Sequence, residues 1–151
     1  MRAIVLDEHS RILLMHFDNP DHGGRFWITP GGGLEPGEPA AACLRRELEE
    51  EVGLTGASIG PPVWTRSHEF RWQGARMRQH ETFHLVRTTA FTPRVDGNPA
   101  SEELAATLDV RWWSVPEIGA AKDVFAPRRL AVLLGRLLDD GPPALPIDVG
   151  I

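Results

Sequence analysis

The feature that most constrains this chain is a dense acidic segment, in which four carboxylates fall within the five residues Glu47–Glu51. It lies at the end of an amphipathic helix predicted over residues 39–52, with Pro39 as the first residue and Gly53 as the stop. The carboxyl end of a helix carries partial negative charge, so each acid there costs roughly 0.3–1 kcal/mol. A function that needs these acids would explain why they stand in this place.

The acids differ in whether the helix offers them a partner. Arg45 and Arg46 each precede an acid of the run by four residues and can pair with it. Glu47 and Glu51 have no such partner, and they lie one turn apart on the same face with Glu50 beside them. A solvated helix face is the simple alternative. Carboxylates kept together without compensating charge favour a divalent cation, and oxygen ligands alone point to Mg²⁺ or Mn²⁺.

A short apolar strand and a glycine-rich loop, Trp27–Pro39, precede the helix. Gly32, Glu38 and the segment Arg46–Leu54 together resemble the Nudix box at every defining position, so the chain is similar to the Nudix hydrolases. The segment Val110–Ile118 resembles the family's late strand leading into a helix. Periodicity alone indicates only an α+β or α/β domain.

The resemblance implies an α/β fold, a Nudix-type α/β/α sandwich with a mixed central sheet. We expect a single domain over residues 1–151, with the box at 32–54 and a Pro-rich tail at 141–151. Apolar runs predict strands at residues 2–6 and 11–17, and alternation of apolar and polar residues supports one at 77–89. Further strands are expected at 63–71 and 110–113, and a helix at 126–138. Pro61 and Pro62 are expected to break the chain before the strand at 63–71. The tail has no clear periodicity, and packing on its own domain, joining a partner and disorder all stay open.

The resemblance also implies a Mg²⁺-dependent hydrolase of diphosphate linkages and assigns roles within the box. We expect Glu47 and Glu51 to be direct metal ligands, Glu50 to be the next, and the carbonyl of Gly31 to complete the site. Arg46 either orients a neighbouring glutamate or makes an ordinary surface ion pair. The same loop carries two residues expected to contact substrate, Gly32 and Gly33.

The general base is left open by the sequence. Glu50 could serve from within the box, and Glu102 and Glu103 lie in a polar segment before the last predicted strand, where some Nudix enzymes carry a catalytic acid. Glu81 is a further option, and His68 a weaker one because a lone histidine near a strand is more often structural. The catalytic residues expected are therefore Glu50, Arg46 and Glu102.

The substrate class expected is a nucleoside triphosphate or another nucleoside diphosphate derivative. Phe70 and Trp72 could stack on a base and Arg78 could reach phosphates, although the same pattern suits a half-buried strand followed by a basic turn. Hydrolases of ADP-ribose or nucleotide sugars, or of dinucleoside polyphosphates, are the alternatives. The proline or tyrosine typical of such subgroups is absent where Glu69–Trp72 stand, and a coenzyme A hydrolase signature is absent before the box.

Two other functions remain as alternatives. An isomerase on the same fold would require a reactive cysteine and an acid outside the box, whereas Cys43 lies inside it and is interpreted as packing. A non-catalytic nucleotide-binding module would usually have a damaged box and a nucleic-acid-binding domain, and this box is intact.

Composition restricts the setting of the molecule. A net charge of −5 gives no general attraction for nucleic acid or anionic membranes, while bound metal could still attract an anionic, nucleotide-like substrate. One cysteine fits a reducing compartment, and no apolar run approaches the roughly 20 residues that span a bilayer. Without a leader-like start, the chain is expected to be cytoplasmic. Its partner is a small molecule, and a homodimer stays open.

Overall fold

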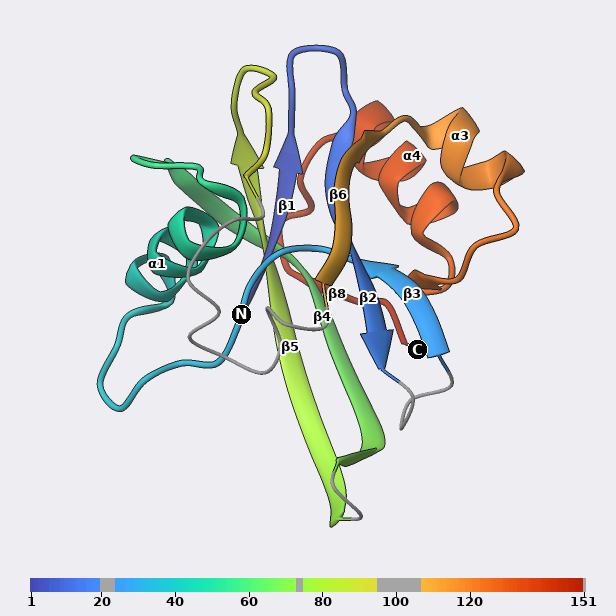
Figure 1. Ribbon diagram of the computed structural model, residues 1–151. Coiled ribbons are helices and arrows are strands. Elements are labelled where there is room, and N and C mark those ends of the chain that lie inside the picture. The colour runs from blue at the N-terminus through green and yellow to red at the C-terminus, as the bar shows by residue number, and fades with distance from the viewer. Residues whose placement is uncertain (20–23, 73–74, 95–106, 151) are drawn as a thin grey trace.

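A computed structural model describes residues 1–19, 24–72, 75–94 and 107–150 of the chain (Figure 1). Its elements, in chain order, are β1 (Arg2–Leu6), β2 (Ile12–Asn19), β3 (Gly24–Ile28), α1 (Ala40–Val52), β4 (Ile59–Trp72), β5 (Ala75–Arg87), β6 (Thr107–Trp113), α3 (Val115–Ala120), β7 (Phe125–Ala126), α4 (Leu130–Asp140) and β8 (Ile147–Asp148). Strands lie at or near each of the ranges predicted from the sequence. Consecutive residues of β1 and of the first half of β2 are buried, because helices cover both sides of the sheet there.

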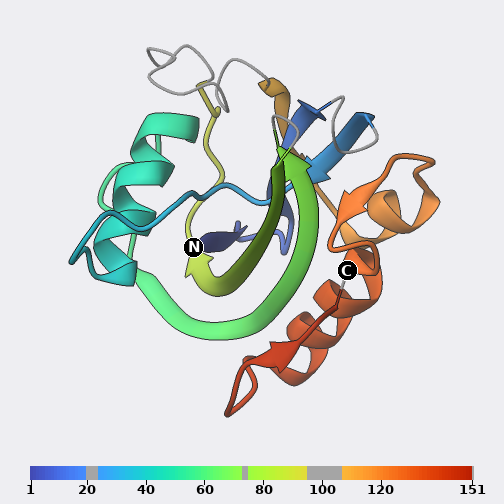
Figure 2. The ribbon, with the colours of Figure 1, turned by 90° about the horizontal axis from the view of Figure 1, so that it is seen from below.

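The described strands form one mixed sheet in the order β7-β3-β2-β1-β5-β4-β8, with β6 paired to β2 as well. β1 runs parallel to β5 at its centre, so Arg2 stands opposite Phe83. β4 and β5 form a long antiparallel hairpin. Figure 2 shows that this hairpin curves strongly, which gives the sheet a concave side.

Helices cover the sheet from both sides, with α1 on one and α3 and α4 on the other (Figure 1). The core is accordingly divided into two clusters of buried apolar side chains. One joins the sheet to α1 through Leu44, Leu48 and Val52, and the other joins it to α4 through Leu130 and Leu134. Burial of each such side chain stabilises the fold by about 1.5–3 kcal/mol. The α/β/α sandwich predicted from the sequence is confirmed.

Helix α1 presents the acidic segment as the sequence predicted, with small differences at its ends. Pro39 is extended (φ −65°, ψ 147°) and serves as the N-cap, so the helix itself begins at Ala40. Gly53 ends it with φ +74°, a left-handed conformation in which the N–H of Gly53 donates to the carbonyl of Glu49 and the N–H of Leu54 to that of Leu48. Because the buried stripe faces the sheet, the acids lie at its margin, next to the glycine loop.

Two sequence-based expectations for local structure were wrong. β4 begins at Ile59 and runs through Pro61 and Pro62, where two register shifts against β5 accommodate residues that cannot donate to the ladder. The last helix begins at Leu130 rather than Ala126, because Phe125–Ala126 pairs with β3 as β7.

The tail packs on its own domain over part of its length. β8 lies parallel to β4, and Val149 donates its N–H to the carbonyl of Thr65 over 2.9 Å. Val149 also packs against the core beside α4. The polar segment at residues 95–106 lies outside the described residues. Among the described helices, none has the length and apolar character to cross a bilayer.

Candidate active site

The glycine loop and the end of α1 meet at two consecutive glycines. Gly31 donates its N–H to Oε2 of Glu51 over 2.7 Å, and this carboxylate is buried. Gly31 has φ +138°, and a Cβ there would collide with the backbone of Met1 and Arg2. A glycine is therefore required at this position, both for its conformation and for the close approach of β1.

Glu47 lies against the next glycine. A Cβ on Gly32 would come closer than 3.0 Å to the Glu47 carboxylate, so the missing side chain makes room for it. Arg46 Nη1 donates to Glu47 Oε1 over 2.6 Å. The sequence left Glu47 and Glu51 without partners, and this was wrong because their partners are an adjacent residue and a loop amide rather than residues one turn away.

Arg46 links the box together. Its guanidinium donates to both carboxylate oxygens of Glu38, at 3.1 and 3.0 Å, and lies 3.7 Å from Glu50 Oε2. Hydrogen bonds from Arg46 lower the pKa of the Glu38 carboxyl to about 2, and Glu38 in turn raises the pKa of Arg46. Glu38 Oε2 also accepts the N–H of Glu35 over 3.0 Å, so Glu38 connects the loop to the helix through Arg46. This arrangement favours the orienting role of Arg46 over an ordinary surface pair.

The acids do not form a ready-made side-chain cluster. Within the described residues, no three His, Cys, Asp or Glu side chains are gathered closely enough to hold a metal ion. Like charges repel, and each acid turns to a different partner: Glu47 to Arg46, Glu51 to the Gly31 amide, and Glu50 toward solvent with half of its side chain exposed. Their donor chemistry still fits Mg²⁺, because carboxylate oxygens lie beside the backbone carbonyls of the glycine loop and Mg²⁺ prefers oxygen ligands. Two of these carbonyls already accept hydrogen bonds, that of Gly31 from Arg2 and that of Gly32 from the amino group of Met1.

A second group of charges lies behind the glycine loop, on the strands. Glu81 of β5 accepts from Arg2 Nε over 2.8 Å and from Arg66 Nε over 2.6 Å, and all three side chains are largely buried. Burial would raise the pKa of the Glu81 carboxyl, but the two arginines hold it below its ordinary value. Arg2 Nη1 also donates to the carbonyl of Gly31 over 3.0 Å. Glu81 is thus committed to two cations, which argues against its use as a general base.

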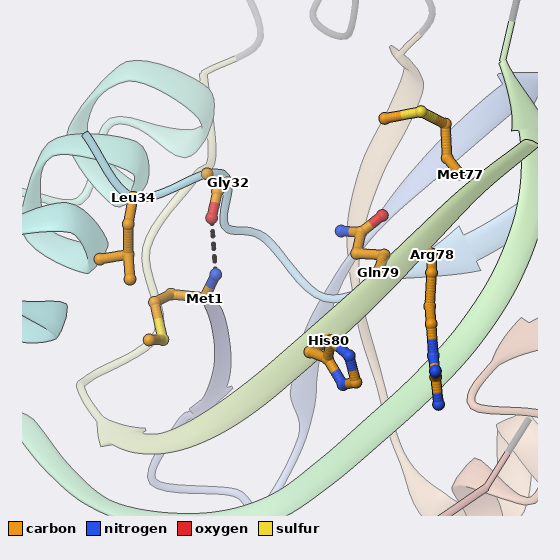
Figure 3. Close-up of a pocket in the computed structure, with 8 residues that line it drawn as sticks. Met1, Gly32, Leu34, Met77, Arg78, Gln79 and His80 are labelled. Atoms are coloured by element: carbon orange, nitrogen blue, oxygen red, sulfur yellow. Dashed lines mark hydrogen bonds between the residues drawn. The ribbon is translucent and has the colours of Figure 1, made fainter. Parts of the chain in front are cut away.

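A cavity of about 320 Å³ opens between the glycine loop and β5 (Figure 3). Three of its lining residues, Gly32, Gly33 and Arg78, were expected from the sequence to contact substrate. Its other lining residues were not predicted: Met1, Leu34, Met77, Gln79 and His80. Strand alternation could have indicated that Met77 and Gln79 share a face, but their proximity to the loop depends on the parallel pairing of β1 with β5. In Figure 3 the side chain of Arg78 leaves β5 on the side opposite to Gln79.

Among the remaining candidates, Cys43 has a side chain that the structure describes and four others do not. The side chains of Phe70 and Trp72, and residues Glu102 and Glu103, lie outside the described part of the chain. Cys43 is buried with its sulfur 3.4 Å from the carbonyl of Gly33, and burial raises the pKa of its thiol. A raised pKa disfavours the thiolate, in agreement with a packing role.

The family of the chain follows from comparison with known proteins. A family model described as NUDIX domain matches residues 1–134. The chain therefore belongs to the NUDIX family, and the assignment made from the box is confirmed at the level of the family.

Several curated relatives are similar over parts of the chain. MutT4 of Mycobacterium tuberculosis is 32% identical over 131 residues, which cover 83% of this chain and 50% of that protein. The 8-oxo-dGTP diphosphatase of Proteus vulgaris is 37% identical over 52 residues, covering 34% and 46%. The RNA pyrophosphohydrolase of Sphingopyxis alaskensis is 24% identical over 132 residues, covering 81% and 80%. The chain spans about half the length of the first two relatives.

Solved structures agree on the fold. The Escherichia coli dihydroneopterin triphosphate pyrophosphohydrolase superposes with a TM-score of 0.64 at 18% identity, covering 91% of this chain and 93% of that one. A MutT protein from Methanosarcina mazei gives a TM-score of 0.61 at 18% identity, covering 92% and 91%. At these identities the likeness is evidence for the Nudix fold alone.

Proposed function

We propose that this chain is a metal-dependent hydrolase that cleaves a diphosphate linkage in a nucleoside triphosphate or another nucleoside diphosphate derivative. The observation that carries the proposal is the contact of two helix carboxylates with two consecutive glycines, Glu51 with Gly31 and Glu47 with Gly32. Oxygen donors from a helix and from a loop backbone thereby converge where phosphates could approach without obstruction from side chains.

Glu47, Glu51 and the carbonyl of Gly31 would hold Mg²⁺, or Mn²⁺ in its place, with Glu50 as a further ligand. The ion would supply charge neutralisation and orientation of the diphosphate oxygens. Arg46 keeps the Glu47 carboxylate turned toward the loop through its 2.6 Å hydrogen bond. Gly32 and Gly33 line the path of the substrate. Arg78, expected from the sequence to reach phosphates, lines the cavity as well, but its side chain leaves β5 on the other side, so we assign the phosphates to the glycine loop and the metal.

Hydrolysis adds the oxygen of water to one phosphorus and breaks the bond from that phosphorus to the bridging oxygen. A carboxylate must accept the proton that the water loses. We assign this role to Glu50 or Glu102, because Glu50 is exposed at the site and is only weakly paired with Arg46. Phe70 and Trp72 stay as proposed base contacts.

Relatives support the substrate class at the level of phosphoric anhydrides. Their names include an 8-oxo-dGTP diphosphatase and an RNA pyrophosphohydrolase, whose substrates contain nucleoside triphosphate or 5′-pyrophosphate groups. Hydrolysis of ADP-ribose or nucleotide sugars, or of dinucleoside polyphosphates, is the alternative within the family. The setting that we propose is the cytoplasm, with a small-molecule substrate and without a membrane or nucleic-acid partner. Sedimentation of the purified chain tests for a homodimer.

The proposal is tested by incubating the chain with nucleoside triphosphates, nucleotide sugars, ADP-ribose and dinucleoside polyphosphates, with Mg²⁺ or with EDTA. We expect metal-dependent cleavage of nucleoside triphosphates to the monophosphate and pyrophosphate. Cleavage of ADP-ribose alone would move the assignment to the alternative class. Metal binding without cleavage of any compound would instead favour a nucleotide-binding module.

A further inference from the structure

We infer that the cavity between the glycine loop and β5 binds the nucleobase of the substrate, with Leu34 and Met77 as its apolar walls and Gln79 as the residue that contacts the edge of the ring. The inference rests on the proposed function, because it takes the phosphates to lie beside Gly31 and Gly32. It adds a base-recognition site to the machinery of hydrolysis.

The walls are two apolar side chains that the fold leaves exposed. Leu34 keeps 49% and Met77 46% of its surface exposed, and both line the same cavity. In Figure 3 Met77 projects from β5 toward the side of the glycine loop, and Leu34 extends from that loop on the facing side. Methionine sulfur makes favourable contacts with aromatic rings, and leucine packs against their faces. A flat ring between them would cover apolar surface that water now contacts.

Gln79 projects from the same side of β5 as Met77 and has a defined orientation (Figure 3). Its side-chain amide donates to Glu81 Oε1 over a long 3.4 Å. An ionised carboxylate only accepts hydrogen bonds, so the NH₂ group faces Glu81. Arg2 and Arg66 fix Glu81 in turn. The amide oxygen of Gln79 makes no hydrogen bond to any described residue.

The oxygen and the second N–H of Gln79, which line the cavity at a half-buried residue, offer an acceptor and a donor side by side. This is the pattern with which glutamine binds a nucleobase edge that carries an amino group next to a ring nitrogen, as adenine does. Ribose and phosphate lack such an edge. The amide therefore favours a base over the other parts of a nucleotide.

Size and position agree with an occupant of this kind. A volume of about 320 Å³ lies at the lower end of the roughly 300–1,000 Å³ range of small-molecule pockets, so the cavity suits one part of a nucleotide rather than the whole. Gly32 and Gly33 line the cavity and also adjoin the carboxylates of α1. A ligand that reaches both places carries a compact ring at one end and phosphates at the other.

The test is the near-isosteric variant Gln79→Met, which keeps the volume and removes donor and acceptor. We would measure kcat/KM for ATP, CTP, GTP and UTP, and the inhibition constant of inorganic tripolyphosphate, which has the phosphates without a base. We expect at least a tenfold loss of kcat/KM for the preferred nucleotide, a narrower spread across the four bases, and an inhibition constant of tripolyphosphate within twofold of wild type. Leu34→Ala and Met77→Ala should each lower kcat/KM for the nucleotides severalfold. Val132→Ala, at an equally exposed apolar residue on α4, serves as the control.

The inference is overturned if Gln79→Met leaves the base preference unchanged. It is also overturned if kcat/KM for nucleotides and the affinity for tripolyphosphate fall by the same factor. Calorimetric binding of the four nucleoside monophosphates in EDTA gives a readout that needs no turnover. If wild type cleaves nothing, the proposed function fails, while a loss of monophosphate binding in Gln79→Met would still support the base site. If neither protein binds a monophosphate, the base site is rejected whatever the hydrolysis assay gives.

Discussion

Two groups of charges lie on either side of the glycine loop, and they are balanced in opposite ways. Around the end of α1, the acids Glu38, Glu47 and Glu50 surround one arginine, Arg46. A fourth acid, Glu51, accepts the N–H of Gly31. Behind the loop, one buried acid, Glu81, lies between the guanidinium groups of Arg2 and Arg66. The first group has negative charge in excess, so a cation added there is favoured. The second already contains its cations.

We therefore interpret the group at the end of α1 as a site for a ligand, and the group around Glu81 as a support for that site. Arg2 joins the two groups, because it donates both to Glu81 and to the carbonyl of Gly31. The strand cluster therefore positions the loop from behind, while the helix acids face the open side. If this division is right, variants of the first group should lose activity with the fold intact, and variants of the second should lose stability.

The largest effect is expected for Glu81→Gln. It leaves two buried guanidinium groups without their counter-charge, and removing one partner of a buried pair costs about 3–5 kcal/mol. Urea unfolding at pH 7 measures the loss. Glu117, paired with Arg111 on the surface, supplies the control, and Glu117→Gln should lose far less stability than Glu81→Gln because solvent screens an exposed pair. Equal losses in the two variants would mean that the strand cluster is no more than another surface pair.

The same variant has a pH signature. The pKa of the Glu81 carboxyl in the folded chain lies below its ordinary value of 4.5. At acidic pH this carboxyl therefore binds fewer protons in the folded chain than in the unfolded one. The stabilisation is complete above pH 4.5 and is lost as the pH falls toward the folded pKa. The gap in unfolding free energy between wild type and Glu81→Gln should therefore narrow below pH 4.5. A constant gap would contradict the ion pairing.

The next effect is expected for Glu47→Gln and Glu51→Gln. Each should reduce kcat/KM by about a hundredfold or more, equivalent to ~2.7 kcal/mol of transition-state stabilisation. Stability should stay equal or rise slightly, because negative charge is removed from the end of a helix and the glutamine oxygen can still accept a hydrogen bond. Mg²⁺ titration followed by calorimetry, alongside thermal unfolding, separates the two effects. Wild-type activity in both variants would refute the metal assignment.

The two groups were not equally accessible to sequence reasoning. The helix acids and their glycine loop lie within 23 residues, so spacing alone brought Glu47, Glu51 and Gly32 to one place. Arg2 and Glu81 are 79 positions apart and meet only because β1 pairs in parallel with β5. The true partners of Glu47 and Glu51 were missed because neither lies three or four residues away on the helix. One is the adjacent side chain of Arg46, and the other is a backbone amide of the loop. Gln79 and Met77 were missed for the same reason as Arg2.

A smaller effect is expected for Gly32→Ala. The new methyl group meets the end of the flexible Glu47 side chain rather than backbone, so the fold can adjust while the carboxylate is displaced. We expect Mg²⁺ affinity to fall about tenfold, or ~1.4 kcal/mol, with a change in unfolding free energy below about 1 kcal/mol. Gly119→Ala, where a Cβ meets nothing within 4 Å, is the matched control. An unchanged metal affinity would remove Glu47 from the ligand set.

The smallest effect is expected for Cys43→Ala, which lies inside the acidic region yet belongs to its packing. The side chain is fully buried, and burial raises the pKa of the thiol, so a thiolate is disfavoured at neutral pH. Loss of one buried sulfur should cost about 1 kcal/mol of stability, and hydrolysis should continue at the wild-type rate. An isomerase that depends on a reactive cysteine would instead lose its activity in this variant. Retained hydrolysis, together with the loss in Glu47→Gln, would locate the chemistry in the carboxylates and exclude the one thiol of the chain from it.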